Sequence, residues 1–165
     1  MSKTLIIGAS GQIGKMTTEL LLENEQNVVA LVRDKNKLSD LNSSFLTIVE
    51  QDLEGDFGDA MKGCDQVIFA AGSGGSTGDD KTVLIDLWAA TKAATFAKEH
   101  GVNHFIMVSS IGADDPDSIQ GDLKPYLVAK HMADEHLINS GLNYTIVRPG
   151  TLTDDSASMQ VTTQR

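Results

Sequence analysis

The clearest chemical signal is a tyrosine and a lysine four positions apart, Tyr126 and Lys130, in a segment with a helical pattern. Side chains at this spacing lie on one face of a helix. A solvated helix face is one interpretation. In the other, the ammonium favours the phenolate, and we expect Lys130 to lower the pKa of Tyr126 toward a value suited to proton transfer to a carbonyl. The pair Ser109-Ser110 follows an apolar run. We assign Ser110 to orient the same carbonyl oxygen and Ser109 to contact a cofactor bound beside the substrate.

A second signal is a set of glycines at three-residue spacing, Gly8, Gly11 and Gly14, between an apolar run and an amphipathic pattern. Glycines at these places permit a tight turn, let backbone N–H groups approach a phosphate, and let the helix pack closely on the strand. The N-terminus of the helix adds the positive end of its dipole. A flexible turn is the alternative for a glycine triplet alone, but the flanking elements favour a dinucleotide pyrophosphate site.

Residues that follow three other apolar runs fit the rest of a dinucleotide. Arg33 stands where an NAD-specific fold presents a carboxylate to the ribose, so we expect NADP(H) to be preferred, with NAD(H) as an alternative. A surface pair between Arg33 and Asp34 is the competing interpretation. Asp52 is placed to accept a hydrogen bond from the adenine amino group, with Leu53 covering the ring. A run of small residues follows the fourth apolar run and forms either a flexible linker or a wall against the cofactor. We favour contact with the cofactor for Ala70, Ala71 and Gly72.

The elements that must position these residues alternate along the chain as short Val- and Ile-rich runs and helical patterns. The expected strands are residues 4–8, 28–33, 46–50, 66–71, 104–109 and 144–148, and the longest helices are 12–24, 81–100 and 125–140. This alternation predicts an α/β fold, a Rossmann-type doubly wound parallel sheet in three layers with strand order 3-2-1-4-5-6. Right-handed crossovers then bring the carboxyl ends of all strands, and the candidate residues, to one edge.

Composition narrows the class of protein. The 165 residues predict a single NAD(P)-binding domain spanning residues 1–165, and 41% apolar with 22% charged residues is typical of a globular chain. A net charge of −10 disfavours nucleic acid and anionic lipid as partners. No apolar stretch is long enough to predict a membrane span, the single cysteine excludes an internal disulfide, and the histidines lack metal-ligand spacing. We therefore expect a cytoplasmic protein without a metal.

Together these residues resemble the short-chain dehydrogenase/reductase (SDR) superfamily, specifically its atypical, NAD(P)H-binding, NmrA-like branch. The resemblance covers nearly the whole chain, including Val108-Ser-Ser-Ile-Gly-Ala113 and Val147-Arg-Pro-Gly150. It implies that Lys130 also bonds the nicotinamide ribose. Further cofactor contacts are implied at the pyrophosphate for Ser10, Gln12 and Ile13, and at the nicotinamide for Pro149 and Gly150. Because such proteins usually continue into a further strand and helix, the resemblance also implies that this chain lacks their usual C-terminal region.

Three functions remain open at this point. The leading one is an NADP(H)-dependent oxidoreductase that reduces a small carbonyl, enone or quinone-like substrate, with Tyr126 as acid, Lys130 as its electrostatic partner and Ser110 as orienting donor. One alternative is an NADP-binding, redox-sensing regulatory protein without turnover. Another is a sugar-nucleotide or isomerase-type enzyme on the same scaffold. The expected partners are the dinucleotide and an unidentified small-molecule substrate, with the protein as a monomer or homodimer.

Overall fold

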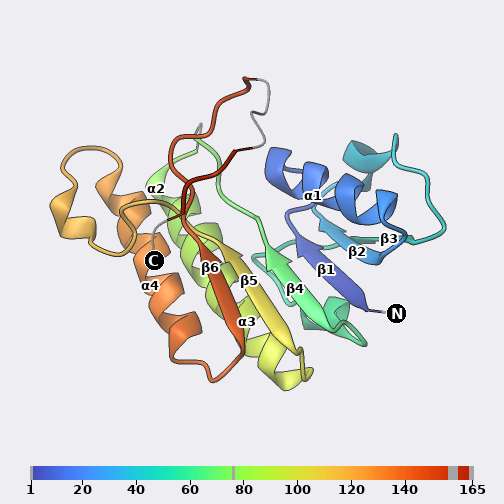
Figure 1. The fold of residues 1–165 in the computed structure, drawn as a ribbon. Coiled ribbons are helices and arrows are strands. Elements are labelled where there is room, and N and C mark those ends of the chain that lie inside the picture. The colour runs from blue at the N-terminus through green and yellow to red at the C-terminus, as the bar shows by residue number, and fades with distance from the viewer. Residues whose placement is uncertain (1, 76, 156–159, 164–165) are drawn as a thin grey trace.

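A six-stranded sheet forms the centre of the molecule (Figure 1). The computed structural model describes residues 2–75, 77–155 and 160–163. All neighbouring strands pair in parallel, in the order β3-β2-β1-β4-β5-β6. Their bounds are β1 (Lys3–Ile7), β2 (Asn27–Val32), β3 (Leu46–Glu50), β4 (Gln66–Phe69), β5 (His104–Val108) and β6 (Tyr144–Val147). The predicted strands and their order are confirmed, and each strand ends within two residues of the predicted position.

Helices connect the strands. The long ones are α1 (Gln12–Glu23), α3 (Ala90–Glu99) and α4 (Lys124–Ile138), with α2 (Asp79–Lys81) and the π-helix η3 (Thr82–Ala89) leading directly into α3. Three short 3-10 turns complete the set: η1 (Lys35–Leu38), η2 (Gly58–Met61) and η4 (Pro116–Ser118). The single helix predicted over residues 81–100 is therefore three segments in sequence, and its π-helical part was not predicted. Within the described residues, none of these helices combines the length and the apolar character needed to span a bilayer.

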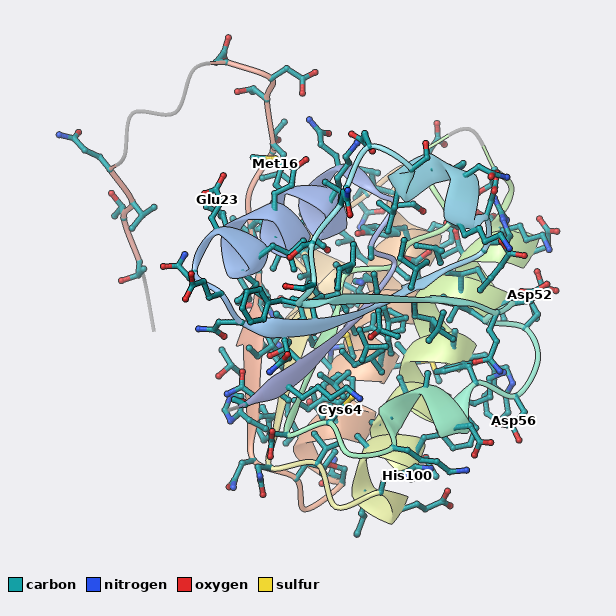
Figure 2. All side chains as sticks on the ribbon, turned by 90° about the vertical axis from the view of Figure 1, so that its right-hand side faces the viewer. Met16, Glu23, Asp52, Asp56, Cys64 and His100 are labelled. Carbon is teal, nitrogen blue, oxygen red and sulfur yellow. The ribbon has the colours of Figure 1, made fainter. Side chains whose placement is uncertain are left out.

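Two apolar clusters lie on opposite faces of the sheet, because successive side chains on a strand point in opposite directions. Leu5 and Ile7 of β1 belong to the larger cluster, which α3 and α4 cover, whereas Ile6 belongs to the smaller one beside α1. Figure 1 shows α1 on one face and α3 with α4 on the other, which confirms the three layers. In Figure 2, Cys64 lies inside the larger cluster and Met16 on the outer side of α1.

The loops that follow the strands meet at one edge of the sheet, as the predicted crossovers require. After β6, residues 148–155 and 160–163 form neither helix nor strand, and residues 156–159 lie outside the described part of the chain. The described residues of the predicted site all lie at or next to this edge, so residues far apart in the sequence can contact one ligand there.

Candidate functional site

A cleft with a volume of about 300 Å³ opens at the carboxyl ends of β1 to β4. Its walls come from the glycine turn, the end of β2, the loop after β3 and the loop after β4. The residues that line it and were singled out in the sequence are Gly8, Ser10, Gly11, Arg33, Asp52, Leu53, Ala70, Ala71 and Gly72. The structure thus brings together in one cleft the residues expected to hold the adenosine half and the pyrophosphate of a dinucleotide.

The glycine turn is fixed by close backbone contacts. Gly8 has a φ of 85°, and a Cβ atom there would lie 2.6 Å from the Cα of Ala71. A Cβ on Gly14 would lie 2.2 Å from the Gly8 carbonyl oxygen, so only glycine allows α1 to start so close to the strand. Gly11 precedes α1, and no side chain caps that helix. The first-turn N–H groups of α1 therefore remain available to an anion at the cleft.

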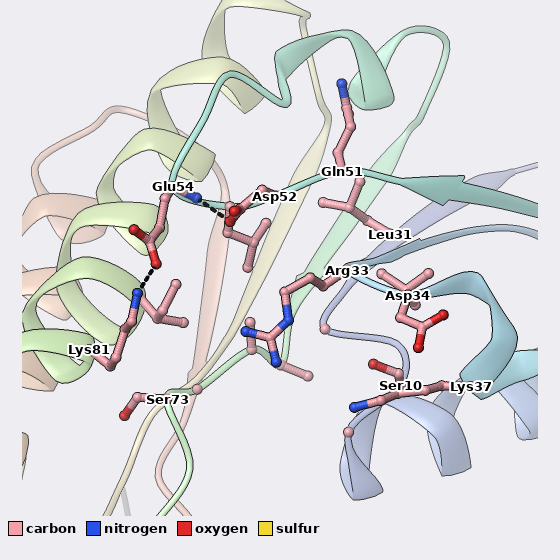
Figure 3. A pocket seen from close by; sticks show the side chains of 18 of the residues that line it. Ser10, Leu31, Arg33, Asp34, Lys37, Gln51, Asp52, Glu54, Ser73 and Lys81 are labelled. Atoms are coloured by element: carbon pink, nitrogen blue, oxygen red, sulfur yellow. Dashed lines mark hydrogen bonds and ion pairs between the residues drawn. The ribbon is translucent and has the colours of Figure 1, made fainter. Parts of the chain in front are cut away.

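Two basic side chains reach into the cleft from the end of β2. Figure 3 shows the Arg33 guanidinium and the Lys37 ammonium pointing into it. The carboxylate of Asp34 does not pair with Arg33; it accepts hydrogen bonds from the backbone and side-chain nitrogens of Asn36, both at 3.0 Å. The ion pair between Arg33 and Asp34 that the sequence allowed is thus not formed, and Asp34 caps η1 instead. Sequence reasoning missed Lys37, although a second cation four positions after Arg33, within the short η1 segment, is a usable signal.

The wall expected to face adenine is a turn after β3 that is tied down from α3. The Asp52 carboxylate accepts a hydrogen bond from the Glu54 backbone nitrogen at 2.9 Å. The Lys92 ammonium donates to the carbonyl oxygens of Leu53 at 2.9 Å and Gly55 at 2.5 Å. Glu54, which also lines the cleft, forms an ion pair with Lys81 (Figure 3). Sequence reasoning missed both lysines, because their partners are 27 and more positions away.

A second pocket adjoins the first and shares Ala70, Ala71 and Gly72 with it. The residues predicted for catalysis (Ser110, Tyr126 and Lys130) and for the nicotinamide (Pro149 and Gly150) lie here. Ser109, predicted to contact the cofactor, and Ile13, predicted for the pyrophosphate, line the same pocket. Gln12 lines neither pocket, and its side-chain amide donates to Asp154. Gly14 lines neither pocket either, because it packs against the Gly8 carbonyl oxygen. With these two exceptions, the residues chosen from the sequence gather around two connected pockets.

Tyr126 and Lys130 share this pocket, but their electrostatics differ from the prediction. Lys130 is 2% exposed, and its ammonium donates to the Val108 carbonyl oxygen at 2.8 Å and lies 3.9 Å from the Asp86 carboxylate. Burial, followed by the carboxylate of Asp86, raises the pKa of Tyr126 above its ordinary value. The expectation that Lys130 lowers this pKa was therefore wrong. Burial lowers the pKa of Lys130 itself, and the neighbouring carboxylates oppose that effect.

The hydroxyl of Ser109 is already used within the protein. It donates to the buried Asp134 carboxylate at 2.8 Å, and Arg148 donates to the same oxygen at 3.1 Å. Ser110 instead donates to the carbonyl oxygen of Ile111 at 3.2 Å, at the surface of the second pocket. Ser110 is thus the serine whose hydroxyl can turn toward a substrate.

Asp86 is the most informative residue that sequence reasoning missed. It is 1% exposed, lines the second pocket, and belongs to η3. A signal was present, since Asp86 is the only charged residue in the apolar run from Val83 to Ala90. A lone carboxylate in a helix that is otherwise apolar indicates a buried charge with a specific partner.

Comparison with known proteins places this geometry in context. Residues 8–165 match the model of a family described as NAD(P)H-binding. An uncharacterized sugar epimerase of Bacillus subtilis, YhfK, is 45% identical over 93% of this chain and 73% of its own length. An NAD(P)H azoreductase of Xenophilus azovorans is 31% identical over 88% of this chain and 47% of its length. Among solved structures, a putative NAD-dependent epimerase/dehydratase from Bacillus halodurans superposes with a TM-score of 0.93 at 42% identity, covering 98% of this chain and 76% of that one.

Proposed function

Because the chain belongs to the NAD(P)H-binding family of atypical SDR and epimerase-like proteins, we propose that it is an NADP(H)-dependent reductase of a small, uncharged carbonyl compound, an enone or a quinone. The observation that supports this most is the position of Tyr126. It lines the pocket next to the cofactor cleft together with Ser110 and Lys130. Burial raises its pKa above the ordinary value, so the phenol keeps a proton that it can give to a carbonyl oxygen.

The first cleft fits a phosphorylated dinucleotide. The turn from Gly8 to Gly11 and the uncapped start of α1 would hold the pyrophosphate, and Arg33 with Lys37 would hold the 2′-phosphate. Leu53 and the Asp52 carboxylate would face the adenine. NADP(H) is thus the cofactor we propose, since two cations at the end of β2 favour a phosphate over a hydroxyl.

The chemistry that the second pocket supports is a proton transfer next to a hydride transfer. A bound nicotinamide supplies the hydride to the carbonyl carbon. Tyr126 donates its phenolic proton to the carbonyl oxygen, the C=O double bond becomes a C–OH single bond, and water restores the proton to the phenolate. Lys130, whose side chain lines the same pocket, would contact the nicotinamide ribose. Ser110 orients the carbonyl oxygen with its hydroxyl group.

The charge of the second pocket bears on the substrate. The charged residues that line it, Asp86 and Lys130, are buried and face each other. Within the described residues, no unpaired cation lines this pocket to receive a diphosphate or a carboxylate. This favours an uncharged substrate over a sugar nucleotide, although the relative YhfK bears the name of a sugar epimerase.

NADPH oxidation with a panel of carbonyls, enones and quinones tests the proposal. We expect turnover with at least one of them, and in Tyr126→Phe a fall in kcat of about a hundredfold or more with NADPH affinity retained. Tyr144→Phe is the matched control, because Tyr144 is the other tyrosine, lies on β6 and lines neither pocket. NADPH binding without oxidation of any compound would favour the sensor, and conversion of a sugar nucleotide would favour the epimerase.

A further inference from the structure

Asp86 is a buried carboxylate to which the proposed reaction assigns no role. Removing such a group from water costs several kcal/mol, so a folded protein retains it only with partners that compensate the charge. Asp86 lies near the middle of η3, and π-helical segments are rare and occur frequently at functional sites.

Each carboxylate oxygen of Asp86 faces a different part of the site. Oδ2 accepts a hydrogen bond from the backbone nitrogen of Ser73 at 3.0 Å, in the loop that separates the two pockets. Oδ1 lies 3.9 Å from the Lys130 ammonium of α4. A Cβ atom on Gly72 would lie only 3.2 Å from this same Oδ1, so the loop passes directly over the carboxylate. One side chain therefore joins the loop after β4 to the lysine beside Tyr126.

We propose that Asp86 is a positioning residue that holds the Gly72–Ser73 loop and Lys130 in one arrangement beside Tyr126 and opposes, through its charge, the deprotonation of that phenol. This inference rests on the proposed function, because a phenol matters only if Tyr126 is a proton donor. The charged groups around Tyr126 are Asp86 from η3, and Lys130 and Asp134 from α4. Of the carboxylates, Asp134 is already paired with the guanidinium that follows β6, whereas Asp86 borders the pocket itself.

The direction of the effect follows from simple electrostatics. A carboxylate near a phenol opposes a second negative charge, so Asp86 favours the neutral phenol. Burial of Tyr126 acts in the same direction, and together they raise its pKa. The same carboxylate stabilises the buried ammonium of Lys130 in its charged form. Removing the charge of Asp86 should therefore make both groups lose their protons at lower pH.

A titration of tyrosine absorbance tests this without any turnover. The chain has two tyrosines, so in a Tyr144→Phe background the tyrosinate signal reports Tyr126 alone. We expect Asp86→Asn to shift the titration to lower pH by about one unit or more, the usual effect of one nearby charge. Asn can still accept the hydrogen bond from Ser73, so the loop contact is kept while the charge is lost.

Thr82→Val is the matched control. The Thr82 hydroxyl contacts the Ser73 hydroxyl at 3.3 Å, so this variant loosens the same loop from the same π-helix without changing charge. Its titration should match that of the parent.

An unchanged titration in Asp86→Asn, or equal shifts in both variants, would overturn the proposal. If Asp86→Asn does not fold, Asp86→Ser, which keeps a hydroxyl acceptor for Ser73, is judged by the same outcomes. Inactivity toward every carbonyl would refute the proposed reductase and leave the titration result intact.

Discussion

Arg33 and Lys37 line the part of the cleft that, in our proposal, distinguishes NADP(H) from NAD(H). Both side chains reach the cleft without an acidic partner in the described part of the chain, so their charges are available to a 2′-phosphate. Asp34 borders the same cleft, but its carboxylate is used in capping η1. At the scale of single residues, the proposed preference for NADP(H) therefore depends on two cations.

We expect Arg33→Ala to reduce the preference for NADPH over NADH by about tenfold or more, since a charge-assisted contact contributes roughly 1.5–3 kcal/mol. Lys37→Ala should have a smaller effect in the same direction, because an ammonium makes no bidentate contact. Calorimetric titration with both nucleotides measures this. Lys35→Ala is the control, as Lys35 is exposed on the same turn and lines neither pocket. Equal affinities of the parent protein for both nucleotides would contradict the assignment.

The pKa of Tyr126 predicts the shape of the pH profile. A pKa raised above the ordinary value of 10.0 means that the phenol is present throughout the neutral range and is lost only at alkaline pH. Turnover in the direction of reduction should therefore stay level through neutral pH and fall above it. The dependence of kcat/KM on pH tests this expectation. A profile that rises steadily with pH would instead indicate a tyrosinate acting as a base.

The spacing of Tyr126 and Lys130 was enough to predict that they share a pocket, but not what they do to each other. Sequence spacing places two side chains on one helix face, and α4 fulfils that condition. The protonation of Tyr126 depends on burial and on Asp86, which is 40 positions away and belongs to another helix. Local patterns do not encode such contacts, so the electrostatics could not be predicted.

At the scale of elements, α3 holds the adenine-side turn through a single lysine. The Lys92 ammonium contacts three successive carbonyl oxygens, of Leu53, Glu54 and Gly55, and lies 5.2 Å from the centroid of the Phe57 ring. Within the turn, the Gly55 backbone nitrogen donates to the Asp52 carbonyl oxygen at 3.1 Å, and the Lys92 ammonium adds contacts from another element. The turn expected to face the adenine is thus held from α3 by Lys92, although Lys92 itself does not line the cleft.

We expect Lys92→Met to weaken the binding of adenosine 2′,5′-bisphosphate several-fold, on the order of 1 kcal/mol, because the ammonium contacts are lost while an apolar stem of similar length remains. Lys98→Met is the control, since Lys98 lies on the same helix and donates to Ser140 at 2.7 Å. Calorimetry on both variants makes the comparison. Equal affinities would show that the turn holds its shape without Lys92.

Most elements could be predicted because each has its own local signal. Apolar runs bounded by Gly, Asp or Asn marked the strands, and Pro125 and Gly141 marked the ends of α4. The π-helix η3 could not be predicted in this way. A change from i→i+4 to i→i+5 bonding leaves the apolar pattern of Val83 to Ala90 almost unchanged. The strand order was predicted from the alternation of six strands with helices, and the meeting of the loops at one edge from the handedness of the crossovers.

The charge of the whole molecule bears on how fast a nucleotide arrives. The net charge is −10, whereas the first cleft is lined by equal numbers of cations (Arg33, Lys37, Lys81) and anions (Asp34, Asp52, Glu54). At a distance, the protein therefore repels a polyanionic nucleotide, and the cations act only at short range.

We expect the association rate constant of NADPH to rise with ionic strength, because salt screens this long-range repulsion. The dissociation rate constant should rise as well, since salt also weakens the contacts to Arg33. Stopped-flow fluorescence of NADPH between low and high salt measures both. In Arg33→Ala the salt dependence of dissociation should shrink while that of association persists. An association rate constant that falls with salt would show that local cations dominate the approach.

The contact between Gly8 and the backbone of Ala71 has a consequence for how the sequence can evolve. The obstructing atoms at Ala71 include its Cα and N, so no exchange of side chain at position 71 would make room at position 8. Gly8 would therefore be retained by a descendant that had lost nucleotide binding altogether. Gly11 is different, because a Cβ there would meet only the Gly8 carbonyl oxygen, at 3.4 Å. Among relatives, the residue at position 11 is thus the better record of whether a phosphate is still bound.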